Sequence, residues 1–295
     1  MDGLAVELLE KIAAFACTDG GRTGRSLSLT SRYIRDTTRA TRFHSVSLTK
    51  KSNDQISQFS SHFLAEQKAL SDRTIPRIRH MCISPAKGAV EVCKLAAPGL
   101  HTLALIQLEE PQQSADDSDD IDVSGVDFPL LRELTILGVG SEFGVVTPLP
   151  KLLSLTRLHI LPLPTKKLAS APDLRLWSLR APGVTHLRVA FTDDTDVVLK
   201  AQIENVAAPE LLGLPVMFSK LEETLIQPTC VQPELPGRLG RHVKIPQFKL
   251  KPSMIATRPL TILPVMTTKL QQLGLAVEDE WSSRMDGGPG CWVGK

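Results

Sequence analysis

The sequence predicts an α+β protein in which a helical N-terminus, reaching to about residue 70, is followed by a curved β-sheet. Two observations support this fold class. Apolar residues of the N-terminal part recur every three to four positions, which is the period of an amphipathic helix. From residue 98 onward a short motif recurs with apolar residues two positions apart, a spacing that places both side chains on one face of a strand.

Three helices are expected ahead of the sheet, over residues 4–16, 27–40 and 53–70. Leu4, Leu8, Ile12 and Phe15 recur at helical spacing in the first helix, with charged residues between them. The glycine-rich turn 18–24 ends that helix. Ser26 is the expected N-cap of the second helix because its hydroxyl can accept an N–H of the first turn.

The strand motif consists of an apolar residue, two variable residues, a second apolar residue, one variable residue and a third apolar residue. This LxxLxL pattern is typical of leucine-rich repeats. The copies begin at Leu100, Leu131, Leu155, Leu174 and Val184. Their spacings of 31, 24, 19 and 10 residues are irregular, so the array is degenerate. Ahead of these copies, residues 43–48 alternate loosely and end in a β-type run, and the run 80–84 is expected to form a first strand.

Two segments lie outside this pattern. Residues 109–127 contain eight acidic residues and little apolar material, so we expect an exposed, mobile surface insertion. Mimicry of nucleic acid and phosphorylation at Ser114 or Ser118 are alternative roles for it. Beyond residue 200 proline is frequent, and only a short strand over 260–263 and a short helix over 276–285 are expected.

Composition indicates a globular chain without a strong charge preference. Hydrophobic residues make up 42% of the 295 residues and aromatic residues only 4%, so Leu, Ile and Val supply most of the core. The formal net charge of +2 by itself implies neither a nucleic-acid nor a membrane partner. The stripe Arg32, Arg35, Arg39 and Arg42 could bind nucleic acid or an acidic partner, or could simply be a solvated face.

Cysteine spacing and the N-terminal charges predict a protein of the cytoplasm or nucleus. The five cysteines are odd in number and widely spaced, which favours neither a disulfide framework nor a zinc site. Asp2, Glu7 and Glu10 interrupt any signal-peptide core, and no run approaches about 18 uninterrupted apolar residues. We expect reduced thiols and no cofactor. His101, His159 and His186 occupy variable positions of the motif and could share one sheet face, but they lack metal-ligand spacing.

Five short pieces of the first 48 residues form a recognisable pattern: Leu4–Glu7, Leu8–Ile12, CTDGG at 17–21, SLSLTS at 26–31 and RFHSVSL at 42–48. Together they resemble the F-box of a large group of basidiomycete proteins, and the later strand motifs resemble the leucine-rich half of the same group. An F-box usually opens with Leu-Pro, whereas this chain has Ala5. Proline would fix the φ angle at the start of the first helix, and alanine leaves it looser.

The resemblance implies an F-box-like helical domain over 1–50, a degenerate leucine-rich-repeat-like domain over 51–200, and a Pro-rich continuation with a C-terminal tail over 201–295. It implies an F-box substrate receptor of an SCF-type E3 ubiquitin ligase, which binds the Skp adaptor of the cullin ligase and recruits a target protein. Such a receptor does no chemistry itself. The residues implied in adaptor binding are Leu4, Leu8, Leu9, Ile12, Leu27 and Leu29.

Other interpretations stay open. The same leucines could simply form the core of a small helical bundle. A protein-binding scaffold without a ligase link and without catalytic activity is the main alternative function. An unrecognised hydrolase is a third, although the chain contains no G-x-S-x-G, H-E-x-x-H, Walker or dinucleotide-binding motif. An enzyme is therefore not expected.

Overall fold

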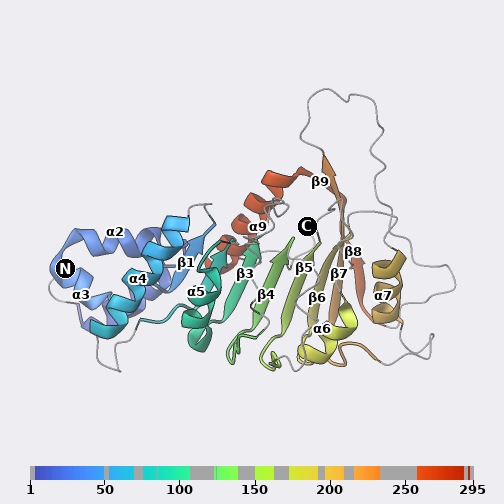
Figure 1. The fold of residues 1–295 in the computed structure, drawn as a ribbon, viewed down its shortest axis with the longest axis horizontal. Helices are drawn as coiled ribbons and strands as arrows, with labels where there is room; N and C mark the ends of the chain where they lie inside the picture. The colour runs from blue at the N-terminus through green and yellow to red at the C-terminus, as the bar shows by residue number, and fades with distance from the viewer. Residues whose placement is uncertain are drawn as a thin grey trace.

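Parallel strands between Ser45 and Lys269 form an open sheet (Figure 1). The computed structural model describes residues 4–49, 53–69, 76–84, 86–106, 123, 125–138, 150–162, 173–191, 197–208, 216–232, 258–288 and 292. Within these residues β1 to β8 lie side by side in sequence order, and β9 pairs with the second half of β7. The strands are Ser45–Leu48, His80–Ile83, Thr102–Ile106, Glu133–Leu137, Arg157–Leu161, His186–Phe191, Glu223–Gln232, Leu260–Ile262 and Met266–Lys269.

Helices lie on both faces of this sheet. The described helices are α1 (Val6–Ala16), α2 (Arg22–Thr30), α3 (Arg32–Thr37), α4 (Asn53–Ala69), α5 (Ala89–Ala96), α6 (Leu174–Arg180), α7 (Val197–Ala207) and α9 (Leu270–Met285). The main core lies between the sheet and helices α4 to α7. A second, smaller core lies on the opposite face, beneath α9. The mixed helix-and-strand class expected from the sequence is confirmed at this level.

The LxxLxL motif describes four of these strands correctly. Its last two apolar residues stack from strand to strand in two continuous rows. The first row is Leu103, Leu134, Leu158 and Leu187, and the second is Leu105, Ile136, Ile160 and Val189. The first apolar residue of each of these copies is also buried, so it closes the core at the turn that leads into the strand.

The strand expected over 172–179 is wrong, because these residues form α6. The Asp173 carboxylate accepts the backbone N–H groups of Arg175 and Leu176 and so caps the helix. Leu174 and Trp177 are buried three positions apart, a spacing that a helix and the first part of the motif share. Without this copy, successive strand motifs at Leu155 and Val184 lie 29 positions apart. The irregularity of the array therefore came largely from a misassigned helix.

The single helix expected over 27–40 is also wrong, since α2 and α3 are separate. Ser31 divides them with an extended backbone (φ −155°, ψ 161°), and its hydroxyl accepts the Ile34 N–H at 3.1 Å. Ser26 lies inside α2 and is not an N-cap. The Asp19 carboxylate instead accepts a backbone N–H of the first turn of α2. The helices expected over 4–16 and 53–70 match α1 and α4.

The acidic insertion falls mostly outside the described residues. At its end, however, Val123 and Val126 are buried in the main core, so the expectation that 109–127 is exposed throughout is wrong there. The strand expected over 260–263 is confirmed as β8. The helix expected over 276–285 is longer than predicted, because α9 begins at Leu270.

Candidate functional site

The turn after α1 fixes the N-terminal helices to the edge strand β1. The Ser45 hydroxyl donates to the Cys17 carbonyl at 2.8 Å and accepts the Gly20 N–H at 3.0 Å. The Gly20 carbonyl accepts the Ser47 N–H at 3.1 Å. Gly20 can serve here because its φ of 71° lies in the left-handed region. The orientation of α1 and α2 relative to the sheet is therefore set by hydrogen bonds between the backbone of this turn and two serines of β1.

Helix α2 is held against the same region by a close backbone approach. A Cβ atom on Gly24 would overlap the carbonyl oxygen of Arg42, so only glycine allows this distance. Arg39 and Arg42 continue the connection to α4, where both contact Glu66, at 2.6 and 2.7 Å. Burial raises the pKa of Glu66, but the hydrogen bonds and charges of the two arginines outweigh it and hold that pKa below its usual value.

The predicted arginine stripe is thus divided between two roles. Arg39 and Arg42 anchor α4, and the Arg42 guanidinium also lies 4.7 Å from the centre of the Phe43 ring. Arg32 and Arg35 are exposed on α3. Only the outer half of the stripe is therefore available to a partner.

The apolar face of α1 points outward. Leu4, Leu8, Ile12 and Phe15 follow one another at helical spacing, and we call these four residues the α1 stripe. Their exposed fractions are 41%, 47%, 49% and 85%. Among the eleven residues of the helix only Ala13 is fully buried. Most of the apolar surface of α1 is thus left without an intramolecular partner in the described structure.

Helices α2 and α3 show the same property on a smaller scale. Leu29 is 79% exposed and Tyr33 is 43% exposed, whereas Leu27 is half-buried. In each of these two helices a single small residue is buried, Gly24 in α2 and Thr37 in α3. The three N-terminal helices therefore bury almost no large side chain of their own.

Six residues were expected from sequence to contact an adaptor, and the structure exposes four of them. Leu4, Leu8, Ile12 and Leu29 are exposed, while Leu9 and Leu27 are half-buried. Three exposed apolar residues of the same helices were not among the six: Val6, Phe15 and Tyr33. The helical period that joins Leu4, Leu8 and Ile12 already included Phe15, so the signal was present.

The face of the sheet under α9 carries a group of buried polar side chains. Glu133 is 9% exposed, and its Oε1 accepts the indole N–H of Trp292 at 3.1 Å. Burial raises the pKa of Glu133, and the Trp292 and Arg284 donors oppose that rise. His159 is fully buried, and this burial keeps its pKa well below the usual value, so the imidazole is neutral.

The histidines do not form one row. His159 and His186 both lie beside Trp292, with ring centres 6.2 and 6.1 Å from the indole. His101 instead lies near His80, 6.3 Å away. Among the described side chains no group of three or more His, Cys, Asp or Glu could hold a metal ion. Of the three motif histidines expected on one face of the sheet, His159 and His186 share a face beside Trp292, and His101 does not lie there.

The described cysteines are buried thiols. Cys17, Cys82 and Cys93 are free, and burial raises the pKa of Cys17 to about 11 and that of Cys93 to about 12. Buried thiols with raised pKa values are poor nucleophiles. These three side chains therefore favour a structural role.

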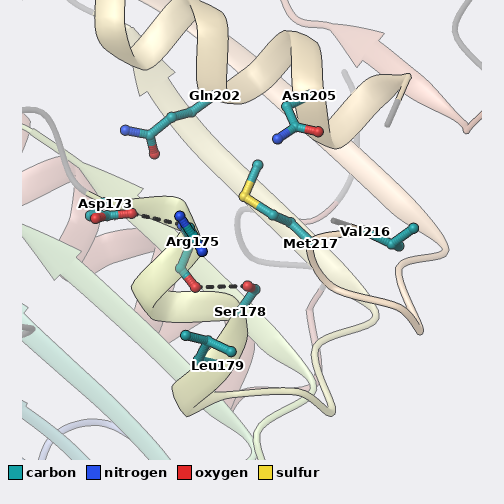
Figure 2. Close-up of a pocket in the computed structure, with 8 residues that line it drawn as sticks. All are labelled: Asp173, Arg175, Ser178, Leu179, Gln202, Asn205, Val216 and Met217. Atoms are coloured by element: carbon teal, nitrogen blue, oxygen red, sulfur yellow. Dashed lines mark hydrogen bonds between the residues drawn. The ribbon is translucent and has the colours of Figure 1, made fainter. Parts of the chain in front are cut away.

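A pocket of about 350 Å³ lies between α6, α7 and the segment at Val216 and Met217 (Figure 2). Its polar groups serve local structure. The Ser178 hydroxyl donates to the Arg175 carbonyl at 2.7 Å, and the Gln202 side-chain oxygen accepts the Leu174 N–H at 2.6 Å. The residues that line it include neither a histidine nor a cysteine, so they offer no nucleophile paired with a base.

Over the part of the chain that the structure describes, each helix is too short or too polar to cross a membrane. Comparison with known proteins found no matching family model, no similar curated protein and no similar solved structure.

Proposed function

We propose that the chain is an F-box substrate receptor of an SCF-type E3 ubiquitin ligase. Helices α1 to α3 dock on the Skp adaptor, and the strand-motif part, a degenerate leucine-rich-repeat array, presents a target protein. The chain itself catalyses no reaction. It brings the target to a high effective concentration beside the ligase.

The outward-facing α1 stripe is the observation that carries this proposal. A surface helix normally turns its apolar stripe toward the core, yet α1 fully buries only Ala13. Large exposed apolar surfaces on a folded chain mark sites for a partner. Anchors spaced three to four residues apart along one helix suit a groove between partner helices.

The rigid attachment of these helices supports a receptor rather than a loose tether. Contacts of Gly20 with Ser45 and Ser47, and of Glu66 with two arginines, connect the helical unit to β1 and α4. A target bound to the sheet would then keep a fixed position relative to the adaptor. Fixed geometry raises the effective concentration of one bound partner near the other.

The alanine in place of the usual proline is compatible with this function. The φ angle of Ala5 is −60°, within the range that a proline ring imposes. Its carbonyl accepts the N–H groups of Leu8 and Leu9, as expected at the start of a helix. Alanine therefore reaches the same local conformation, although nothing covalent enforces it.

The order of the strands supports the leucine-rich-repeat half of the proposal. Strand motifs at Leu100, Leu131, Leu155 and Val184 give neighbouring parallel strands in sequence order. A stack in which each unit contacts only its neighbours is the arrangement of repeat proteins.

The test is direct binding to the purified Skp adaptor, measured by isothermal titration calorimetry with the full chain. We expect one-to-one binding at micromolar affinity or better. Leu275→Ala is a matched control, because Leu275 is an exposed apolar residue of α9, outside the N-terminal helices. Absence of binding at micromolar concentrations would exclude the ligase function and leave the non-ligase scaffold in its place.

A further inference from the structure

The C-terminal helix α9 covers the sheet on the side away from α5, α6 and α7 (Figure 1). Its inward residues Leu273, Val277 and Trp281 lie four positions apart and form one helical stripe. The stripe packs on an apolar strip of the sheet, formed by Cys82, Ala104, Ile106, Leu137, Leu161 and Ala190. This face of the sheet therefore accommodates an amphipathic helix.

Polar groups beside the apolar strip bind the same C-terminal segment. Glu133 faces Arg284 at 3.4 Å in addition to its bond from Trp292. Arg188, which is 5% exposed, reaches Glu280 of α9 at 3.5 Å. A carboxylate, a guanidinium and an indole of one segment thus meet complementary groups on neighbouring strands.

The imidazole of His159, on the same face of the sheet, receives no hydrogen bond from the described residues of the C-terminal segment. His159 is on β5, between β4, which carries Glu133, and β6, which carries Arg188. The strand register places His159 in one row with Thr135 and Arg188, whereas Glu133 lies two positions before Thr135 on β4. The side chain of His159 is fully buried, and neither ring nitrogen has a hydrogen-bond partner within the described residues. A neutral imidazole has one donor and one acceptor, and leaving both unsatisfied in the interior costs free energy.

Beneath α9 the indole N–H of Trp281 is likewise buried without a partner among the described residues. The apolar residues of α9 therefore pack on the sheet, whereas His159 and the Trp281 indole at this contact lack hydrogen-bond partners among the described residues. A different helix that also satisfied His159 would gain hydrogen bonds that the present occupant does not make.

We propose that Glu133, His159 and Arg188 form the centre of a peptide-binding site, and that α9 and Trp292 are its intramolecular occupants. The competing ligand is an amphipathic helical segment of a target protein. That segment supplies apolar residues for the strip, an indole or guanidinium donor for Glu133 and a carboxylate for Arg188. A hydroxyl or amide side chain completes the match at His159.

This inference rests on the target-recruiting half of the proposed function and is independent of the adaptor-binding half. Tethering gives the C-terminal segment a high effective concentration at the site. A target helix must therefore make contacts that the segment lacks, and His159 provides them. The chemistry of the site thus selects its target by polar groups rather than by apolar area alone.

A labelled synthetic peptide of residues 270–292 tests the site in trans. Binding of the peptide to the full-length chain is compared with binding to the double variant Arg284→Gln, Trp292→Phe. The variant removes the guanidinium and indole donors to Glu133 and so weakens the intramolecular contact, but it keeps an aromatic ring at position 292 and an aliphatic chain at position 284. We expect the peptide to bind the double variant at least tenfold more tightly than the parent chain. Adding Glu133→Gln to the double variant should reverse this gain. Leu275→Ala, on the outer side of α9, should behave like the parent chain.

Native-state hydrogen exchange on the unmodified chain provides a second measurement that needs no variant. We expect the amides of α9 to exchange through local opening, faster than those of β3 to β5. Equal protection of α9 and the central strands, or equal peptide binding by the parent chain and the folded double variant, would each overturn the proposal. The peptide assay contains no adaptor, so its failure would not bear on adaptor docking. Likewise, absence of adaptor binding would not bear on the peptide-binding site.

Discussion

Replacing Leu8 and Ile12 together by alanine should separate adaptor binding from folding. Both side chains are about half exposed, at 47% and 49%. Full burial of such a residue contributes roughly 1.5–3 kcal/mol, so roughly 1 kcal/mol per residue remains to be gained when a partner covers it. The two changes should then weaken adaptor binding by about 2 kcal/mol, or roughly thirtyfold at about 1.4 kcal/mol per decade.

The stability of the free chain should also fall, because the buried halves of the same side chains are lost. Phe15→Ala resolves this overlap. Phe15 is 85% exposed, so its loss should leave the melting temperature nearly unchanged while it weakens binding by about 2 kcal/mol, the free energy of burying such a side chain. Glu7→Ala, an exposed position of α1 outside the stripe, is the matched control.

The assay is calorimetric titration of each variant with the adaptor, with circular dichroism and thermal melting recorded in parallel. Unchanged affinity in the Leu8, Ile12 double variant and in Phe15→Ala, with helical content intact, would refute the assignment of the α1 stripe as the docking face. Loss of affinity in Glu7→Ala as well would show that the assay responds to helix stability rather than to the stripe.

Three further predictions concern the N-terminal unit. Ala5→Pro should raise the free energy of unfolding by about 0.4–1 kcal/mol, because the φ angle already suits proline; a lower melting temperature would contradict this. Gly24→Ala should lower the free energy of unfolding by about 1–3 kcal/mol, because the added Cβ meets the Arg42 carbonyl. Alanine normally favours helices, so a gain in stability, measured by denaturant unfolding, would exclude this close approach. The lowered pKa of Glu66 means that its pairing with Arg39 and Arg42 stabilises the fold above the unfolded pKa and is lost as the pH falls through the folded pKa. Glu66→Gln should therefore flatten the dependence of melting temperature on pH in the acidic range, and an unchanged slope would refute this contribution.

The strand part of the fold was predictable where the motif contained large aliphatic residues. Copies at Leu100, Leu131, Leu155 and Val184 became strands because their alternate side chains face one core. The copy at Leu174 forms a helix instead, because its first two apolar residues also suit one face of a helix and the preceding Asp173 is a preferred N-cap residue.

Strand β7 escaped prediction for a different reason. Its motif begins at Leu221 but has Thr224 as the second member, and Pro228 lies within the strand. Threonine is buried there all the same, and proline normally argues against a central strand. Residues 223–232 form a strand because they pair with β6, β8 and β9, and no local sequence pattern indicates this pairing.

The candidate sites divide in the same way. Exposure of the α1 stripe is implied only by the family resemblance, because the same helical spacing also suits the core of a small bundle. The binding of Trp292 to Glu133 could not be anticipated, since it joins positions 159 apart in the chain. Such a pair depends on the register of the whole sheet, which single-sequence periodicity does not contain.

The hydrogen bonds from Ser47 and Thr49 to Glu278 connect β1 with a helix synthesised after all the described strands. The Ser47 bond spans 231 positions, far beyond the neighbour-to-neighbour contacts of the rest of the sheet. Contacts of such long range form slowly and late. During synthesis the apolar strip that includes Ala104, Leu137 and Leu161 therefore stays uncovered until α9 is made, and in that interval it is open to association with other chains.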